Sequence, residues 1–128
     1  MTIAYWCIFI AGIMPYFWVG CAKFSGKRPY NNHAPRKYCE ALETRSWRKR
    51  AYWAHLNQFE SFPLFAAAVL SALLIGKIDH ALIDQIAVAY IIARLGYGVC
   101  YLTDKPTLRS LHWFIGVGLI FSLFFLSR

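Results

Sequence analysis

Four long apolar stretches, separated by short polar breaks, run along the chain. They cover about residues 2–22, 51–76, 82–103 and 107–127, and each provides the roughly 20 residues that a helix needs to cross a bilayer about 30 Å thick. The apolar positions are continuous rather than alternating, which favours helices over the shorter strands of a membrane barrel. The predicted fold class is therefore all-α integral membrane: a four-transmembrane-helix bundle in a single domain over residues 1–128.

Two features of the apolar stretches refine this prediction. Pro15 and Pro63 lie inside the first and second stretches, and each is expected to kink its helix because proline removes a backbone donor. The first stretch has no basic leader and no small-residue cleavage site. We therefore expect a retained span rather than a cleaved signal peptide.

Composition and charge argue against a soluble protein and predict an orientation. Hydrophobic residues make up 59% of the chain and charged residues 16%, against about 45–50% and about 25% in soluble domains. The net charge is +8, and nine of the fourteen basic residues lie in the loop 23–50. Because basic loops favour the cytoplasm, both termini are predicted to be non-cytoplasmic, in a bacterial inner membrane. The charge thus indicates topology and contact with the lipid bilayer, and no nucleic-acid partner is expected.

Cysteine and histidine residues give no indication of a metal site. Four of each are scattered along the chain, without a C-x-x-C or zinc-type spacing. We interpret the cysteines as small packing residues.

Two charged residues, Glu60 and Arg94, fall deep inside predicted spans. Each lies nine residues from the cytoplasmic end of its span, which corresponds to a depth of about 14 Å at 1.5 Å per residue. Charged groups at membrane depth are costly and mark functional sites by default. The matching depth predicts a Glu60–Arg94 ion pair, within one chain or between neighbouring subunits, that acts as a structural clamp or as part of a binding site.

Further polar residues share faces with this pair. Asn57 lies three residues before Glu60, while Tyr97 and Tyr101 follow Arg94 at helical spacing, so each set forms one stripe. Tyr101 has an alternative role in an interfacial aromatic belt.

The fourth stretch opens with Asp104-Lys105-Pro106, interpreted as a cap residue followed by a first-turn proline. Arg109 and Ser110 fall in or next to that turn. A helix start with a basic residue and a hydroxyl is suited to holding a thiolate or carboxylate, although many helices begin this way.

Residues 54–63, AHLNQFESFP, resemble the A-H-x-N-x-x-E-x-x-P signature of the MAPEG family, membrane-associated proteins in eicosanoid and glutathione metabolism. Arg94, Tyr101 and Arg109-Ser110 resemble that family's third and fourth spans. The resemblance implies a microsomal glutathione transferase-like homotrimer with glutathione bound between subunits near the cytoplasmic face. It implies Arg109 and Ser110 as catalytic residues, and the implied glutathione-binding residues are His55, Asn57, Glu60, Arg94, Tyr97 and Tyr101.

The chain also departs from the family pattern. Trp53 stands where glutathione-using relatives usually have arginine. Leu56 stands where the eicosanoid synthases have a further arginine, and Tyr97 stands where histidine is frequent in the family. Anionic groups of glutathione thereby lose expected partners, and the candidate replacements are Lys23, Arg28, Lys49 and Arg50. Two functions stay open: a glutathione-dependent transferase or peroxidase acting on a lipophilic small molecule, and a non-catalytic membrane protein that binds a lipid or partner helices on the same trimeric scaffold.

Overall fold

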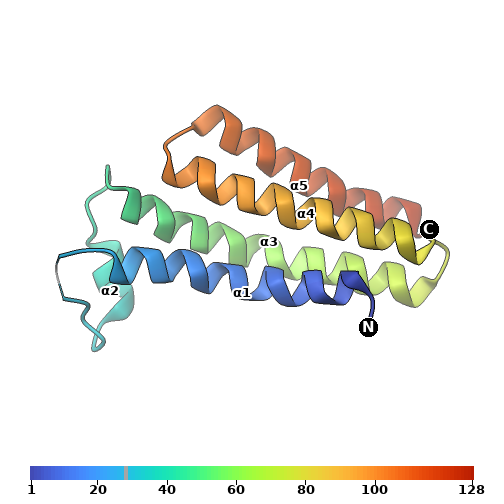
Figure 1. The fold of residues 1–128 in the computed structure, drawn as a ribbon, viewed down its shortest axis with the longest axis horizontal. Coiled ribbons are helices and arrows are strands. Elements are labelled where there is room, and N and C mark those ends of the chain that lie inside the picture. Colours follow the sequence, from blue (N-terminus) through green and yellow to red (C-terminus); the bar gives the residue numbers. More distant parts are fainter. Residues whose placement is uncertain (28) are drawn as a thin grey trace.

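The computed structural model describes residues 1–27 and 29–128, and the described chain folds into helices (Figure 1). They are α1 (Ile3–Phe24), α2 (Pro35–Glu40), α3 (Trp47–Ile75), α4 (His80–Leu102) and α5 (Pro106–Leu126). The four long helices are long and apolar enough to cross a membrane, which confirms the predicted fold class. Their outward side chains include large exposed apolar groups such as Ile92 and Phe125, as expected where the solvent is lipid.

The long helices run up and down in one bundle. Both termini and the α3–α4 turn lie at one end, while α2 and the α4–α5 turn lie at the other (Figure 1). Helix α1 packs along α3 and α4 along α5, and α3 also contacts α4 and α5. The end that carries α2 therefore also carries the start of α5, where the sequence places Arg109.

Small residues bring the helices close together. Ala11 on α1 and Ala68 on α3 are fully buried, and Gly98 of α4 lies against α1. A Cβ atom at Gly98 would lie 2.1 Å from Cζ2 of the buried Trp18 side chain. Because lipid tails are as apolar as a protein core, such close backbone packing is a main source of helix association in membranes.

Helix α3 begins four residues before the predicted start of the second span. Ser46 is its N-cap, and the Ser46 hydroxyl oxygen accepts a hydrogen bond from the Lys49 backbone N–H at 3.1 Å. This cap satisfies a donor that would otherwise have no helical partner. The helix is continuous past Pro63, and the short helix α2 was not predicted.

The predicted cap of the last helix is wrong. Lys105, not Asp104, is the N-cap of α5, and Asp104 has φ 57°. The Asp104 N–H donates to the Tyr101 carbonyl at 3.2 Å and the Lys105 N–H to the Cys100 carbonyl at 2.9 Å. This pair of bonds closes α4 with a left-handed residue after its C-cap. Asp104 therefore ends α4 instead of starting α5.

Candidate functional site

Arg94 is a charged side chain buried within the bundle, only 1% exposed. Its Nε donates to Oε1 of Gln58 at 2.8 Å, and its Nη2 donates to Oδ1 of Asn57 at 2.8 Å. The guanidinium carbon lies 4.2 Å from the centre of the Tyr97 ring. A buried cation is tolerated only when hydrogen bonds replace its water, and here two amides of α3 provide them.

Asn57 connects this buried cation to Glu60. Its Nδ2 donates to Oε2 of Glu60 at 3.1 Å while its Oδ1 accepts from Arg94. The prediction of a direct Glu60–Arg94 ion pair is therefore wrong within one chain. The physical reason is position: Glu60 lies on the exposed side of α3 and Arg94 in the interior, so an amide spans the gap. The predicted shared face of Asn57 and Glu60 is confirmed.

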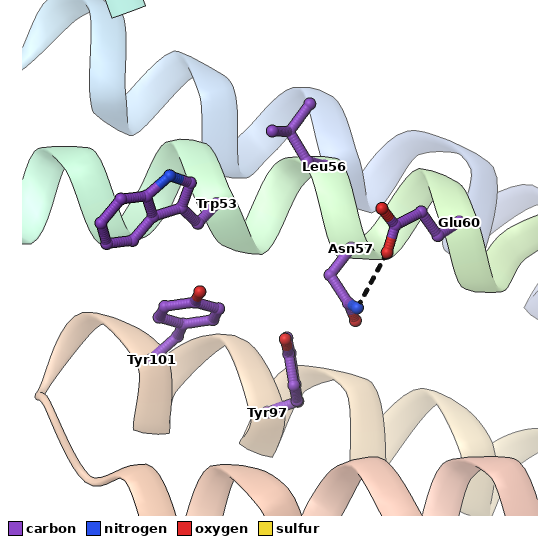
Figure 2. Close-up of a pocket in the computed structure, with 6 residues that line it drawn as sticks. All are labelled: Trp53, Leu56, Asn57, Glu60, Tyr97 and Tyr101. Atoms are coloured by element: carbon purple, nitrogen blue, oxygen red, sulfur yellow. Dashed lines mark hydrogen bonds between the residues drawn. The ribbon is translucent and has the colours of Figure 1, made fainter. Parts of the chain in front are cut away.

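Tyr97 and Tyr101 of α4 point toward α3 (Figure 2). The Tyr97 and Tyr101 rings meet edge to face at 5.6 Å, and the Trp53 ring lies 6.3 Å from Tyr101. The Arg109 guanidinium carbon lies 4.5 Å from the centre of the Tyr101 ring. The stripe predicted along α4 is thus confirmed, and Tyr101 links it to the first turns of α5.

Two adjoining cavities, here called the twin cavity, open beside these residues. The first has a volume of about 380 Å³ and is lined by Trp53, Leu56, Asn57, Glu60, Tyr97 and Tyr101 (Figure 2). The second has a volume of about 350 Å³ and is lined by Asn57, Tyr97, Tyr101, Arg109, Ser110, Trp113 and Phe114. Asn57 and the two tyrosines belong to both linings. Most of the candidate residues from the sequence therefore meet at one place.

Trp113 and Phe114 were not among the sequence candidates. Trp113 lies four residues after Arg109, so helical spacing from that arginine was the available signal. Phe114 is 67% exposed, and its ring is apolar. The second cavity is consequently bounded on one side by groups suited to contact lipid.

His55 does not join the twin cavity. Its Nδ1 donates to the Pro15 carbonyl at 2.8 Å, and its ring packs between Tyr52 and Phe59 of its own helix. It lines a separate cavity of about 640 Å³ between α1, α2 and α3, together with Lys23. The structure therefore gives His55 a role in holding α1 against α3.

Comparison with known proteins gives one result. The sequence model of the MAPEG family matches residues 3–128. The chain belongs to the MAPEG family. It is accordingly an integral multi-pass membrane protein with a four-helix bundle fold. No curated protein and no solved structure matches it.

In this MAPEG protein, two of the candidate replacement cations bind backbone carbonyls instead of lining the site. The Lys49 ammonium donates to the Cys39 carbonyl at 3.2 Å and to the Glu40 carbonyl. Arg50 donates from Nε and Nη2 to the Leu102 carbonyl at 3.3 and 3.0 Å, and from Nη1 to the Arg45 carbonyl at 2.8 Å. These bonds tie α3 to α2 and to the end of α4. Arg28, the fourth candidate, lies outside the described residues.

The cysteines and histidines of this MAPEG protein show no cluster. Among the described residues, no three His, Cys, Asp or Glu side chains lie close enough to hold a metal ion. Cys39 of α2 is a free and buried thiol, and burial raises its pKa above the ordinary cysteine value. Its environment is therefore that of a packing residue, not of a reactive thiolate.

Proposed function

We propose that this MAPEG protein is a glutathione-dependent transferase or peroxidase of the microsomal glutathione transferase kind. It binds a thiol in the twin cavity and joins the thiol sulfur to a lipophilic electrophile as a thioether, or it reduces a lipid hydroperoxide with two thiols, which yields an alcohol, water and a disulfide. The observation that supports this most is the lining of the twin cavity, in which Glu60, Asn57 and Arg109 gather around two tyrosines. Polar groups are costly at membrane depth, so a polar cavity there favours a binding site.

Arg109 is the proposed thiolate-stabilising residue. The thiolate, not the thiol, is the nucleophile, and a nearby cation lowers the thiol pKa. The Arg109 guanidinium is held against the Tyr101 ring, beside Ser110 in the lining of the second cavity. It lies near the start of α5, where the helix dipole also favours an anion. Ser110 lines the same cavity, and its hydroxyl is proposed to donate a further hydrogen bond to the sulfur.

The electrophile is proposed to arrive from the bilayer. Trp113 and Phe114 line the second cavity, and Phe114 is largely exposed on the apolar surface. A lipophilic molecule can therefore reach the thiolate without passing through water. The thiolate sulfur attacks the electrophilic carbon, and the leaving group departs with the bonding electrons.

The assembly and orientation are part of the proposal. We infer a homotrimer with sites near subunit boundaries, supported by exposed residues of the twin cavity such as Leu56 and Glu60. We also infer a bacterial inner membrane with both termini on the non-cytoplasmic side. Crosslinking in native membranes tests the trimer, and reporter fusions at the C-terminus test the orientation.

Steady-state conjugation of chlorodinitrobenzene with glutathione tests the activity. Arg109→Ala is expected to lower kcat/KM by about tenfold to a hundredfold, the equivalent of one lost charge-assisted hydrogen bond. Lys105→Ala is the matched control, because it removes a neighbouring cation that lines neither part of the twin cavity. Equal activity of wild type and Arg109→Ala, or no wild-type rate above the uncatalysed reaction, contradicts the proposal.

The alternative is a non-catalytic protein that binds a lipid or partner helices, and one observation favours it. Trp53 and Leu56 put apolar groups into the wall of the first cavity, where anionic thiol peptides need cations. A thermal-shift experiment with glutathione separates the two functions, because a ligand of the native state raises its unfolding temperature. No shift with glutathione, together with a shift on adding lipid, supports the alternative.

A further inference from the structure

Gln58 and Asn57 give the buried Arg94 side chain hydrogen bonds but no negative charge. Both acceptors are neutral amide oxygens, each at 2.8 Å. The Glu60 carboxylate accepts from Asn57 and not from the guanidinium. Among the described residues, Arg94 is therefore hydrogen-bonded within the bundle without a carboxylate bonded directly to it.

Gln58 can serve Arg94 in one orientation only. A guanidinium donates and never accepts, so Oε1 of Gln58 must face Arg94 and Nε2 must point elsewhere. Gln58 is 1% exposed, and its Nε2 has no acceptor among the described residues. A buried donor without a partner lowers stability. Glutamate has nearly the same shape and no such donor, but it would add a negative charge beside the cation. The amide thus preserves the charge of Arg94 and leaves one of its own donors unpaired.

The preserved charge lies close to the twin cavity. The Arg94 guanidinium carbon is 4.2 Å from the centre of the Tyr97 ring, and Tyr97 lines both parts of the cavity. The neighbouring Tyr101 ring holds the Arg109 guanidinium. Each ring of this tyrosine pair therefore has a cation against it. The titratable groups that line the twin cavity in the described chain are Glu60, Tyr97, Tyr101 and Arg109.

The unit formed by Gln58 and Arg94 is complete within one subunit. Each of the two side chains is 1% exposed in the single chain, so a neighbouring subunit has almost no access to them. Helix α5 contributes Gly116 beside the Arg94 stem, which adds no charge. Charges that a neighbouring subunit brings to the twin cavity are the same in wild type and in variants at position 58, so they cancel in a comparison. The titratable groups that face the guanidinium are Tyr90 and Tyr97 of α4 and Glu60 of α3.

We propose that Gln58 is a positioning residue whose neutral amide keeps the charge of Arg94 available to the twin cavity, where it acts together with Arg109 on the bound thiolate. This inference rests on the proposed function. Arg94 lines neither part of the cavity, so it acts through space. At a separation of about 10 Å and an effective dielectric constant of about 20, one charge changes the pKa of an ionisable group by about one. A carboxylate at position 58 cancels most of this effect.

Gln58→Glu tests the charge directly. Titrating the ultraviolet thiolate absorbance of the purified full-length protein with saturating glutathione against pH gives the pKa of the bound thiol. The variant still accepts from Nε of Arg94 but adds a negative charge, so we expect this pKa to rise by about one, which means about tenfold less thiolate at a pH below both values. Gln85→Glu is the matched control, because it adds the same charge to an exposed position of α4 in a groove away from the twin cavity, and it should keep the wild-type pKa.

Gln58→Met separates the charge from the hydrogen bond. Methionine has a similar length but provides neither an oxygen acceptor nor a charge. We expect Gln58→Met to unfold at a lower concentration of sodium dodecyl sulfate than wild type, while the thiol pKa stays within about 0.3 of the wild-type value. A purely structural role for Gln58 predicts the opposite order, in which Gln58→Met changes the thiol pKa more than Gln58→Glu does.

A double variant removes the cation without adding a titratable group. Gln58→Met combined with Arg94→Met replaces the buried pair by apolar side chains, and it should raise the thiol pKa as Gln58→Glu does. This variant decides the question if Gln58→Glu does not fold. A thiol pKa within about 0.3 of wild type in either variant overturns this inference and leaves the proposed function standing. Absence of a thiolate signal in wild type at every pH overturns both.

Discussion

Asn57 holds the buried polar cluster together, and replacing it is expected to destabilise the bundle strongly. Asn57→Ala removes the acceptor for Nη2 of Arg94, one of two hydrogen bonds to a cation that is only 1% exposed. A hydrogen bond to a charged group contributes about 1.5–3 kcal/mol. The Asn57–Glu60 bond adds less, since Glu60 lines the first cavity, where a bound water or a ligand can replace the amide. The total expected loss in free energy of unfolding is about 2–3 kcal/mol.

The assay is unfolding by sodium dodecyl sulfate in mixed micelles, followed by circular dichroism. Glu60→Gln is the control, because the amide oxygen of the new side chain still accepts from Asn57 and Arg94 keeps both partners. We expect a loss below about 1 kcal/mol for the control, because both hydrogen bonds of Asn57 are kept. The reasoning is refuted if Asn57→Ala unfolds within about 0.5 kcal/mol of wild type, or if both variants lose the same stability.

Three further predictions concern the scaffold. Gly98→Ala is expected to lower the free energy of unfolding by about 1–3 kcal/mol in the same assay, since its Cβ overlaps Trp18. Gly118→Ala, with open space around it, should not lower it. Asp104→Gly should raise stability by up to about 1 kcal/mol, because glycine adopts the left-handed conformation freely. Because its pKa is raised, Cys39 should stay protonated at neutral pH and resist alkylation by maleimide. The alkylation rate, measured by peptide mass spectrometry, should increase as the pH rises.

The four spans were predictable from the sequence because continuous apolar runs at bilayer length leave helices as the simplest solution. The Asn57–Glu60 contact was predictable as well, since it depends only on spacing along one helix. Gln58 as an Arg94 partner was not, because that bond depends on how α3 and α4 are rotated and offset against each other. Each helix is apolar on nearly all sides, so the pattern of apolar residues does not indicate which side faces a neighbour.

The wrong cap prediction for Asp104 and the place of His55 outside the twin cavity have similar physical causes. A capping role for Asp104 was expected from residue type, but the left-handed end of α4 takes Asp104 out of position. His55 belongs to the signature segment, yet it faces the Pro15 carbonyl, which sequence spacing could not reveal. The first depends on the geometry of the α4–α5 turn. The second depends on a contact between α1 and α3, whose residues are distant in the sequence.

Thiolate formation beside Arg109 is the central claim, and its spectroscopic signal tests it most directly. Mixing the purified protein with glutathione in a stopped-flow instrument at neutral pH is expected to produce the ultraviolet absorbance of a bound thiolate. In Arg109→Ala this signal should fall by at least about tenfold, because the cation that lowers the thiol pKa is gone, whereas Lys105→Ala should keep it. No thiolate signal in wild type, or an undiminished signal in Arg109→Ala, would contradict the account.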